Sequence, residues 1–241
     1  RSLGSEFVVE ALAQDYNCFI YSGELPDFYV KAWMDRQIIG KKELYNSDIS
    51  ECEEWYKERL RIYDNRALPE DGEEMEGLIE TVEEAIIHKN CRLILLDNLM
   101  TALSECNTND QLYMAQSNFL GKLVRLAQIY EVIILLVAHP RKGGQEFQND
   151  DVSGSADITN KVETVMSYDK IEDKKDPDYD REEVRVLRVT RNRLTGKLGK
   201  IKLYYSEDSK RINDSENFIR HYLPEEEQGF VDPDEEEEVP W

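Results

Sequence analysis

Hydrophobic positions along the chain follow two patterns in turn, helical spacing and short continuous apolar runs. Apolar residues recur every three to four positions over 3–14, 75–87 and 112–130. Runs with the length of strands buried on both faces occupy 18–22, 92–96 and 132–138. Helices and strands that alternate in this way predict βαβ units, and therefore an α/β fold with a mostly parallel twisted sheet flanked by helices.

Further elements are expected around these. The segment 26–37 predicts a helix with Pro26 in its first turn, and 51–60 predicts another with Ser50 as its N-cap. A short strand at 62–64, a helix at 152–162 and a strand at 164–171 complete the central part. The nearly alternating segments 184–190 and 200–205, with a turn between them, predict an antiparallel hairpin at the C-terminal edge of the sheet.

Composition divides the chain into a globular part and a tail. With 241 residues, 40% of them hydrophobic, the sequence is long enough for one large domain, which we expect over 1–215. The segment 216–241 ends in a glutamate-rich stretch that cannot bury enough apolar surface to order itself, so a disordered acidic tail is expected there.

The charge and cysteine patterns exclude several functions. A formal net charge of −21 opposes attraction of the whole molecule to nucleic acid or anionic membranes, so any contact with a polyanion must be local, as in the basic stretch 185–202. No apolar run is long enough for a membrane span, and the beginning of the sequence lacks the features of a secretory signal. The cysteines lack C-x-x-C spacing and predict reduced thiols in a cytoplasmic protein: Cys18, Cys52, Cys91 and Cys106.

Three polar residues follow apolar runs at the point where each run ends. Glu24 comes after CFIYSG, Asp97 after RLILL and His139 after VIILLVA, and a basic Pro-Arg-Lys follows the histidine. Ligands bind at the carboxyl ends of the strands in open parallel sheets, so these side chains are expected to converge. Two carboxylates, an imidazole and a basic loop at one edge predict phosphate and metal chemistry.

Four stretches in this order resemble the RecA-type motor domain of hexameric replicative helicases, among them the mitochondrial Twinkle helicase, the phage primase-helicases and, more distantly, DnaB. They are RLILLDNLM, VIILLVAHPRK, VSGSA and VTRNRLTGKLG. The resemblance covers residues 3 to 212. It implies a P-loop NTPase core, Mg²⁺ with ATP or another nucleoside or deoxynucleoside triphosphate, and translocation on single-stranded DNA as a ring of six or seven subunits. By the same resemblance the protein acts in a bacterial, phage-infected or mitochondrial setting.

The resemblance implies roles for the three strand-end residues. Asp97 matches the Walker B carboxylate that holds Mg²⁺ and its water shell. Glu24 matches the glutamate that orients and deprotonates the attacking water. His139 matches the sensor of the γ-phosphate. The alternatives are that Asp97 caps a helix or forms a turn, that Glu24 caps the helix at Pro26, and that His139 is structural.

Four basic residues receive roles in the same way. Arg141 and Lys142 match the start of the loop that grips the phosphates of single-stranded DNA in the central channel. Their alternative is a solvated loop. Arg193 matches the arginine finger that reaches the nucleotide of the adjacent subunit, with Arg191 beside it, and a guanidinium suits this role because it stays charged and bonds phosphate oxygens through two donors. If so, the active site is shared between subunits.

One departure from the family pattern concerns the phosphate loop. The sequence contains no G-x-x-x-x-G-K-[ST]. Gly4 and Ser5 resemble the end of that loop without its lysine, and Ser5 would be the magnesium-binding hydroxyl. The simplest explanation is a fragment of a longer parent whose loop is complete. The alternative for both residues is a helix N-cap.

The tail ends in Val239-Pro240-Trp241 behind a run of glutamates. Such tails resemble docking peptides of phage replication proteins, which implies a DNA polymerase or primase as partner. A solubilising tail is the alternative. Two other functions stay open, a degenerate RecA-like module that binds DNA or a partner without hydrolysis, and a strand-exchange recombinase.

Overall fold

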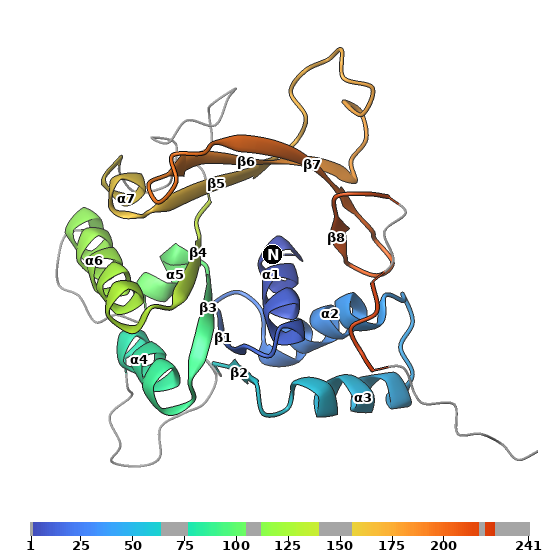
Figure 1. The fold of residues 1–241 in the computed structure, drawn as a ribbon, viewed down its shortest axis with the longest axis horizontal. Helices are drawn as coiled ribbons and strands as arrows, with labels where there is room; N and C mark the ends of the chain where they lie inside the picture. Colours follow the sequence, from blue (N-terminus) through green and yellow to red (C-terminus); the bar gives the residue numbers. More distant parts are fainter. Residues whose placement is uncertain (1, 64–76, 105–111, 140–155, 217–219, 225–241) are drawn as a thin grey trace, which may run out of the picture.

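The computed structural model describes residues 2–63, 77–104, 112–139, 156–216 and 220–224. Its strands form two sheets (Figure 1). The first is parallel, has the order β2-β1-β3-β4, and consists of β1 (Asn17–Ser22), β2 (Leu60–Ile62), β3 (Cys91–Asp97) and β4 (Ile133–Val137). The second is antiparallel, follows chain order, and consists of β5 (Thr164–Asp169), β6 (Val184–Asn192), β7 (Gly199–Tyr205) and β8 (Ile212–Asn213).

Helices cover both faces of the parallel sheet. One face carries α1 (Ser2–Ala13), α2 (Asp27–Ile39) and α3 (Asn46–Tyr56). The opposite face carries α4 (Leu78–His88) and α6 (Leu112–Tyr130), together with the short α5 (Leu99–Ser104). The remaining helix, α7 (Ala156–Lys161), packs against α6.

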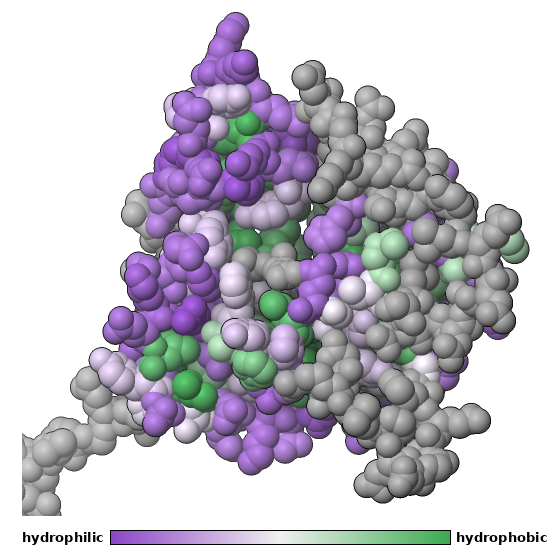
Figure 2. Space-filling view, turned by 180° about the vertical axis from the view of Figure 1, so that it is seen from behind, coloured by the Kyte–Doolittle hydropathy of each residue, from purple (hydrophilic) through white to green (hydrophobic). Residues whose placement is uncertain are grey.

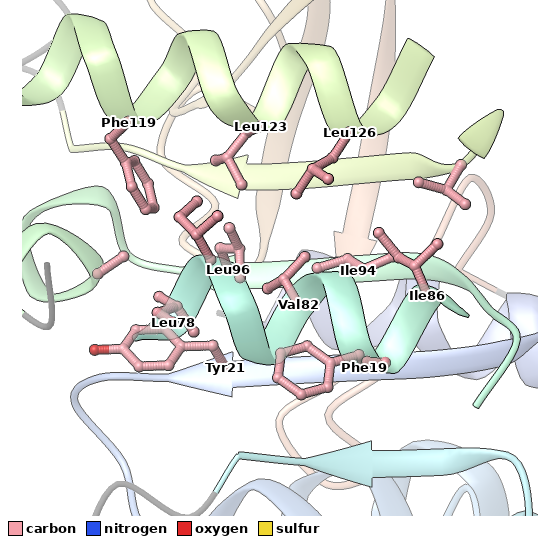
Figure 3. Packing of buried hydrophobic residues seen from close by; sticks show 14 of the residues in the cluster. Phe19, Tyr21, Leu78, Val82, Ile86, Ile94, Leu96, Phe119, Leu123 and Leu126 are labelled. Atoms are coloured by element: carbon pink, nitrogen blue, oxygen red, sulfur yellow. The ribbon is translucent and has the colours of Figure 1, made fainter. Parts of the chain in front are cut away.

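The core strands are apolar on both faces because helices cover both. Phe19 and Tyr21 of β1 point toward α4 (Figure 3), whereas Cys18 and Ile20 pack on the side of α1 and α2. In β3 the residues alternate in the same way, with Ile94 and Leu96 on the α4 side. The continuous apolar runs of the sequence thus reflect a doubly covered parallel sheet.

The α/β class and most predicted elements are confirmed, but the position of α3 is wrong in the prediction. α3 begins at Asn46, and Ser50 lies inside it instead of capping it. The carboxylate of Asp48 accepts the backbone N–H of Tyr45 at 2.8 Å, which fixes an earlier start. The following strand is accordingly Leu60–Ile62 and not 62–64.

The C-terminal hairpin forms as predicted, but it lies in a different sheet from the one predicted. β6 and β7 pair as expected, but they belong to the second sheet and do not extend the parallel one. Among the described residues β4 is an edge of the first sheet and β5 an edge of the second. Ile133 of β4 is 61% exposed and Met166 of β5 is 39% exposed, so apolar side chains remain at both edges.

On the face shown in Figure 2 the described residues are largely hydrophilic, in keeping with the high content of charged residues. Within the described segments, no helix is long and apolar enough to cross a membrane. Cys18, Cys52 and Cys91 are buried and free. Cys106 and, from the tail expected over 216–241, residues 217–219 and 225–241 lie outside the described residues. Within the expected tail, Tyr222 is nevertheless ordered, because its hydroxyl donates to Glu10 of α1 at 2.7 Å and its ring packs on the core.

Candidate functional site

Strand register brings the three predicted strand-end residues to one edge of the parallel sheet. Ser22 pairs with Asp97, and the N–H of Gly23 donates to the Asp97 carbonyl at 2.8 Å, so Glu24 lies just beyond the end of β1. Asp97 also pairs with Val137, which places His139 two residues past the end of β4. The convergence follows from the parallel arrangement, since the carboxyl ends of all three strands meet there.

Glu24 is the centre of this group. Its Oε1 accepts a hydrogen bond from Nδ2 of Asn98 at 2.6 Å. His139 Nε2 lies 3.7 Å from the same oxygen, which permits an ion contact when the imidazole is protonated. The side chain of His139 is 62% exposed and that of Glu24 33% exposed, so both are accessible to a ligand. α2 has Pro26 as its N-cap residue, so Glu24 lies two positions before the cap.

Asp97 is suited to magnesium. The residue is 9% exposed, and its buried Oδ1 has no hydrogen-bond partner among the described residues. Buried carboxylate oxygens are normally satisfied, so an orphaned one at a sheet edge fits a ligand for a hydrated cation. The described part of the chain holds no cluster of three or more His, Cys, Asp or Glu with metal-binding geometry. Mg²⁺ keeps several waters, so one carboxylate with waters and phosphate oxygens meets its needs.

Asn98 was missed by the sequence analysis. Its Oδ1 accepts the N–H groups of Met100 and Thr101 at 3.0 and 3.2 Å, so Asn98, and not Asp97, caps α5. α5 has only six residues, too few to show a helical period of hydrophobic positions in the sequence. The only signal was a second polar residue directly after Asp97.

Gly4 and Ser5 lie inside α1 and do not cap it. A Cβ on Gly4 would lie 3.0 Å from Cδ1 of Leu95, which stands two residues before Asp97 on β3. The first turn of α1 therefore packs closely on β3 near its carboxyl end. Ser5 is 7% exposed. The shared role of Ser5 and Asp97 with Mg²⁺ stays a prediction.

Arg191 and Arg193 lie on the second sheet. Arg191 Nη2 donates to Asn160 Oδ1 at 3.0 Å, and Nη1 donates to the Thr159 carbonyl. Arg193 Nη2 donates to the Asn160 carbonyl at 2.5 Å. In this chain both guanidinium groups thus bind the end of α7. Arg141 and Lys142 lie outside the described residues.

Two residues of the basic stretch, Arg188 and Lys202, pair with carboxylates of β5 and of the acidic connector between β5 and β6. Lys202 Nζ donates to Asp176 and Asp178 at 2.6 and 2.7 Å. These bonds raise the pKa of Lys202 and lower those of the two carboxyls. Arg188 lies 3.5 Å from Asp169. The paired cations are therefore part of the second sheet's own structure.

Comparison with known proteins gives a clear result for the fold. No family model matches the sequence, and no curated protein matches it. Among solved structures, a DnaB-like replicative helicase studied for its interactions with primase superposes with a TM-score of 0.68 at 11% identity, over 88% of this chain and 53% of that one. The ATPase domain of G40P gives 0.64 at 10% identity, over 86% and 79%. The RadB recombinase gives 0.54 at 13% identity, over 88% and 87%.

These neighbours share the RecA-like fold, and this chain has it too. The predicted fold class is therefore confirmed. At identities of 10 to 13% the likeness concerns the fold alone. The chain spans about half, 53%, of the DnaB-like helicase chain.

Proposed function

We propose that this chain is the motor domain of an ATP-dependent replicative DNA helicase that moves along single-stranded DNA as a ring. The observation that carries the proposal is the group at the sheet edge, in which Glu24 lies 3.7 Å from His139 and accepts a hydrogen bond from Asn98, the residue that follows Asp97 with its orphaned carboxylate oxygen. The DnaB-like helicase and the G40P ATPase domain supply the matching fold.

Each residue has a defined task in this proposal. Glu24 takes the proton of the attacking water. Asp97, with Ser5, holds the water shell of Mg²⁺, which when bound with the nucleotide neutralises charge on the phosphates. His139 contacts the γ-phosphate and passes its state to Arg141 and Lys142, which bind DNA phosphates.

The phosphate loop would be supplied by a parent chain that continues upstream of α1. The chain passes through α4 between β2 and β3, and through α6 between β3 and β4. Both connections move across the sheet toward β4, and both helices lie on one face. α1 lies on the opposite face, so a right-handed connection through it must step in the opposite direction. A strand that enters α1 would therefore lie beyond β4. Among the described strands none pairs with the outer edge of β4, and its Ile133 is exposed, which supports this arrangement.

Arg191 and Arg193 would reach the nucleotide of the neighbouring subunit, which requires them to exchange the Asn160 contacts for phosphate oxygens.

The test of the proposed function is DNA-stimulated ATP hydrolysis by the full-length parent, compared with its Glu24→Gln and Arg193→Ala variants. Glu84→Gln, on the exposed face of α4, is the control. Loss in both variants, partial recovery on mixing them, and no loss in the control are expected. Variants that fail to recover on mixing would contradict a shared site.

A second candidate function is a degenerate RecA-like module that binds DNA or a replication partner. The sequence of the parent around residues 1–5 separates it from the motor, because an intact G-x-x-x-x-G-K loop there supports the motor and its absence from the parent supports the module. No hydrolysis by a parent that still binds DNA would support this module. A strand-exchange recombinase is a third candidate because RadB shares the fold, and strand exchange without unwinding would favour it.

We also propose that the acidic tail binds a DNA polymerase or primase. The glutamate run and Trp241 within 234–241 support this function. Deletion of the tail should abolish binding to the cognate polymerase and leave hydrolysis unchanged. Unchanged polymerase binding would leave the solubilising role.

A further inference from the structure

Asn98 is a buried residue that contacts the carboxylate expected to act as the base. Its Nδ2 lies 2.6 Å from Glu24 Oε1, and the residue is 3% exposed. Glu24 stands on the segment between β1 and α2, with its side chain 33% exposed. A fixed amide thus meets a carboxylate from a different part of the chain.

The orientation of this amide is set by α5. The Asn98 oxygen faces the N–H groups of Met100 and Thr101, and the Asn98 N–H lies 3.2 Å from the hydroxyl of Thr101. The reverse orientation would set the amide NH₂ against two N–H donors and its oxygen against the Glu24 carboxylate. Only one orientation satisfies both sides, so the nitrogen must face Glu24.

We infer that Asn98 is a positioning residue that fixes the direction of the Glu24 carboxylate for attack on the nucleotide. The inference rests on the proposed role of Glu24 as base. A base must lie within ~3 Å of the proton it takes, and a misplacement of ~1 Å can cost about 100-fold in rate. His139 lies 3.7 Å from the same oxygen, beyond hydrogen-bond distance, whereas the Asn98 bond at 2.6 Å is short enough to restrain the carboxylate.

Two substitutions separate this role from helix capping. Asn98→Asp keeps an equally good N-cap but offers no N–H to Glu24 and places a second carboxylate beside it. Asn98→Ser keeps a capping oxygen and adds no charge. Asn118→Asp, on the exposed side of α6, makes the same chemical change away from the site.

The first measurement is steady-state ATP hydrolysis by the full-length parent in the presence of single-stranded DNA. In Asn98→Asp and Asn98→Ser, kcat should fall by about 10- to 100-fold while KM for ATP stays within about twofold. Asn118→Asp should match the unaltered protein. A kcat within about twofold of normal in both Asn98 variants, or a loss confined to KM, would overturn the inference.

The second measurement is independent of hydrolysis and so separates failure of this inference from failure of the proposed function. The side-chain amide resonance of Asn98 is assigned by NMR from its absence in Asn98→Asp. In Glu24→Ala it should move upfield because the charged acceptor is lost, while in Glu84→Gln it should stay in place. If the chemical shift of the Asn98 side-chain amide were the same in Glu24→Ala as in the unaltered protein, the inference would be refuted even if the parent hydrolyses ATP.

Discussion

Asp35 accepts a hydrogen bond from the hydroxyl of Tyr56, with 3.1 Å between Oδ1 and Oη, and thereby joins α2 to α3. Both residues are buried. Burial raises the pKa of Asp35 from 3.8 to about 6; the Tyr56 hydrogen bond and Lys31 oppose the rise, and Glu53 adds to it. The helix pair that covers one face of the parallel sheet therefore contains a proton-binding carboxyl.

This carboxyl should make stability depend on pH. Because its pKa is higher in the folded state, the folded protein binds the proton more tightly, so the stabilisation is complete below about pH 4 and is lost as pH rises through 6. The shift corresponds to ~3 kcal/mol. Between pH 4 and 7, Asp35→Asn should gain up to that amount in unfolding free energy relative to the unaltered protein, as measured by urea denaturation.

The matched control for Asp35→Asn is Asp180→Asn, at an exposed position of the connector before β6. Its stability difference from the unaltered protein should change by less than ~1 kcal/mol over the same range. A difference for Asp35→Asn that stays constant from pH 4 to 7 would contradict the assignment.

Gly40 should be intolerant of a side chain, whereas Gly121 should accept one. Gly40 ends α2 with φ of 82°, and an added Cβ would lie 2.8 Å from Cζ of Arg211. That guanidinium donates to the carbonyls of Gln37 and Ile38 at 2.5 and 2.7 Å, so moving it would break bonds at the end of the helix. Gly40→Ala should destabilise the protein by at least ~1 to 2 kcal/mol.

Gly121 is the internal comparison for this change. It lies within α6, and an added Cβ would meet no atom within 4 Å. Gly121→Ala should therefore stabilise by up to ~1 kcal/mol, because alanine is the better helix former. Thermal unfolding of the two variants should give shifts in Tm of opposite sign, downward for Gly40→Ala and upward for Gly121→Ala. Shifts of the same sign would contradict the prediction.

The parallel core could be predicted because each of its strands carries its own signal, a continuous apolar run, in neighbouring residues of the sequence. A strand covered on both faces must be apolar throughout, so runs such as the one ending at Asp97 predicted both the strand and the edge where its polar residue lies. The meeting of Glu24 and His139 followed from the same reasoning, because parallel strands end together. Their catalytic roles stay predictions.

What could not be predicted depends on contacts between distant segments. The bond from Asn98 to Glu24 joins positions 74 residues apart and depends on α5, which is too short for a hydrophobic period. The separation of β5 from β4 was also missed. Alternation of side chains identifies a hairpin but does not say which sheet receives it.

The buried thiols should resist alkylation in the folded protein. Burial raises the pKa of Cys91 to about 11 and those of Cys18 and Cys52 to about 12, so almost no thiolate forms near neutral pH. Mass spectrometry after iodoacetamide treatment at pH 8 should show all three unmodified, and fully modified after denaturation in urea. Rapid modification of any of them without denaturant would contradict the buried positions.

Salt dependence of DNA binding should distinguish Lys202 from the predicted DNA-binding loop. Lys202 is already bonded to Asp176 and Asp178, so Lys202→Gln should leave the slope of log affinity against log salt unchanged. If Arg141 and Lys142 each neutralise one DNA phosphate, replacing both with alanine should reduce that slope by about 1.4, since each contact to a single strand contributes ~0.7. Fluorescence anisotropy with a labelled oligothymidine at several salt concentrations measures both slopes. A loss of slope in Lys202→Gln alone would mean that the second sheet, and not the loop after His139, contacts the DNA.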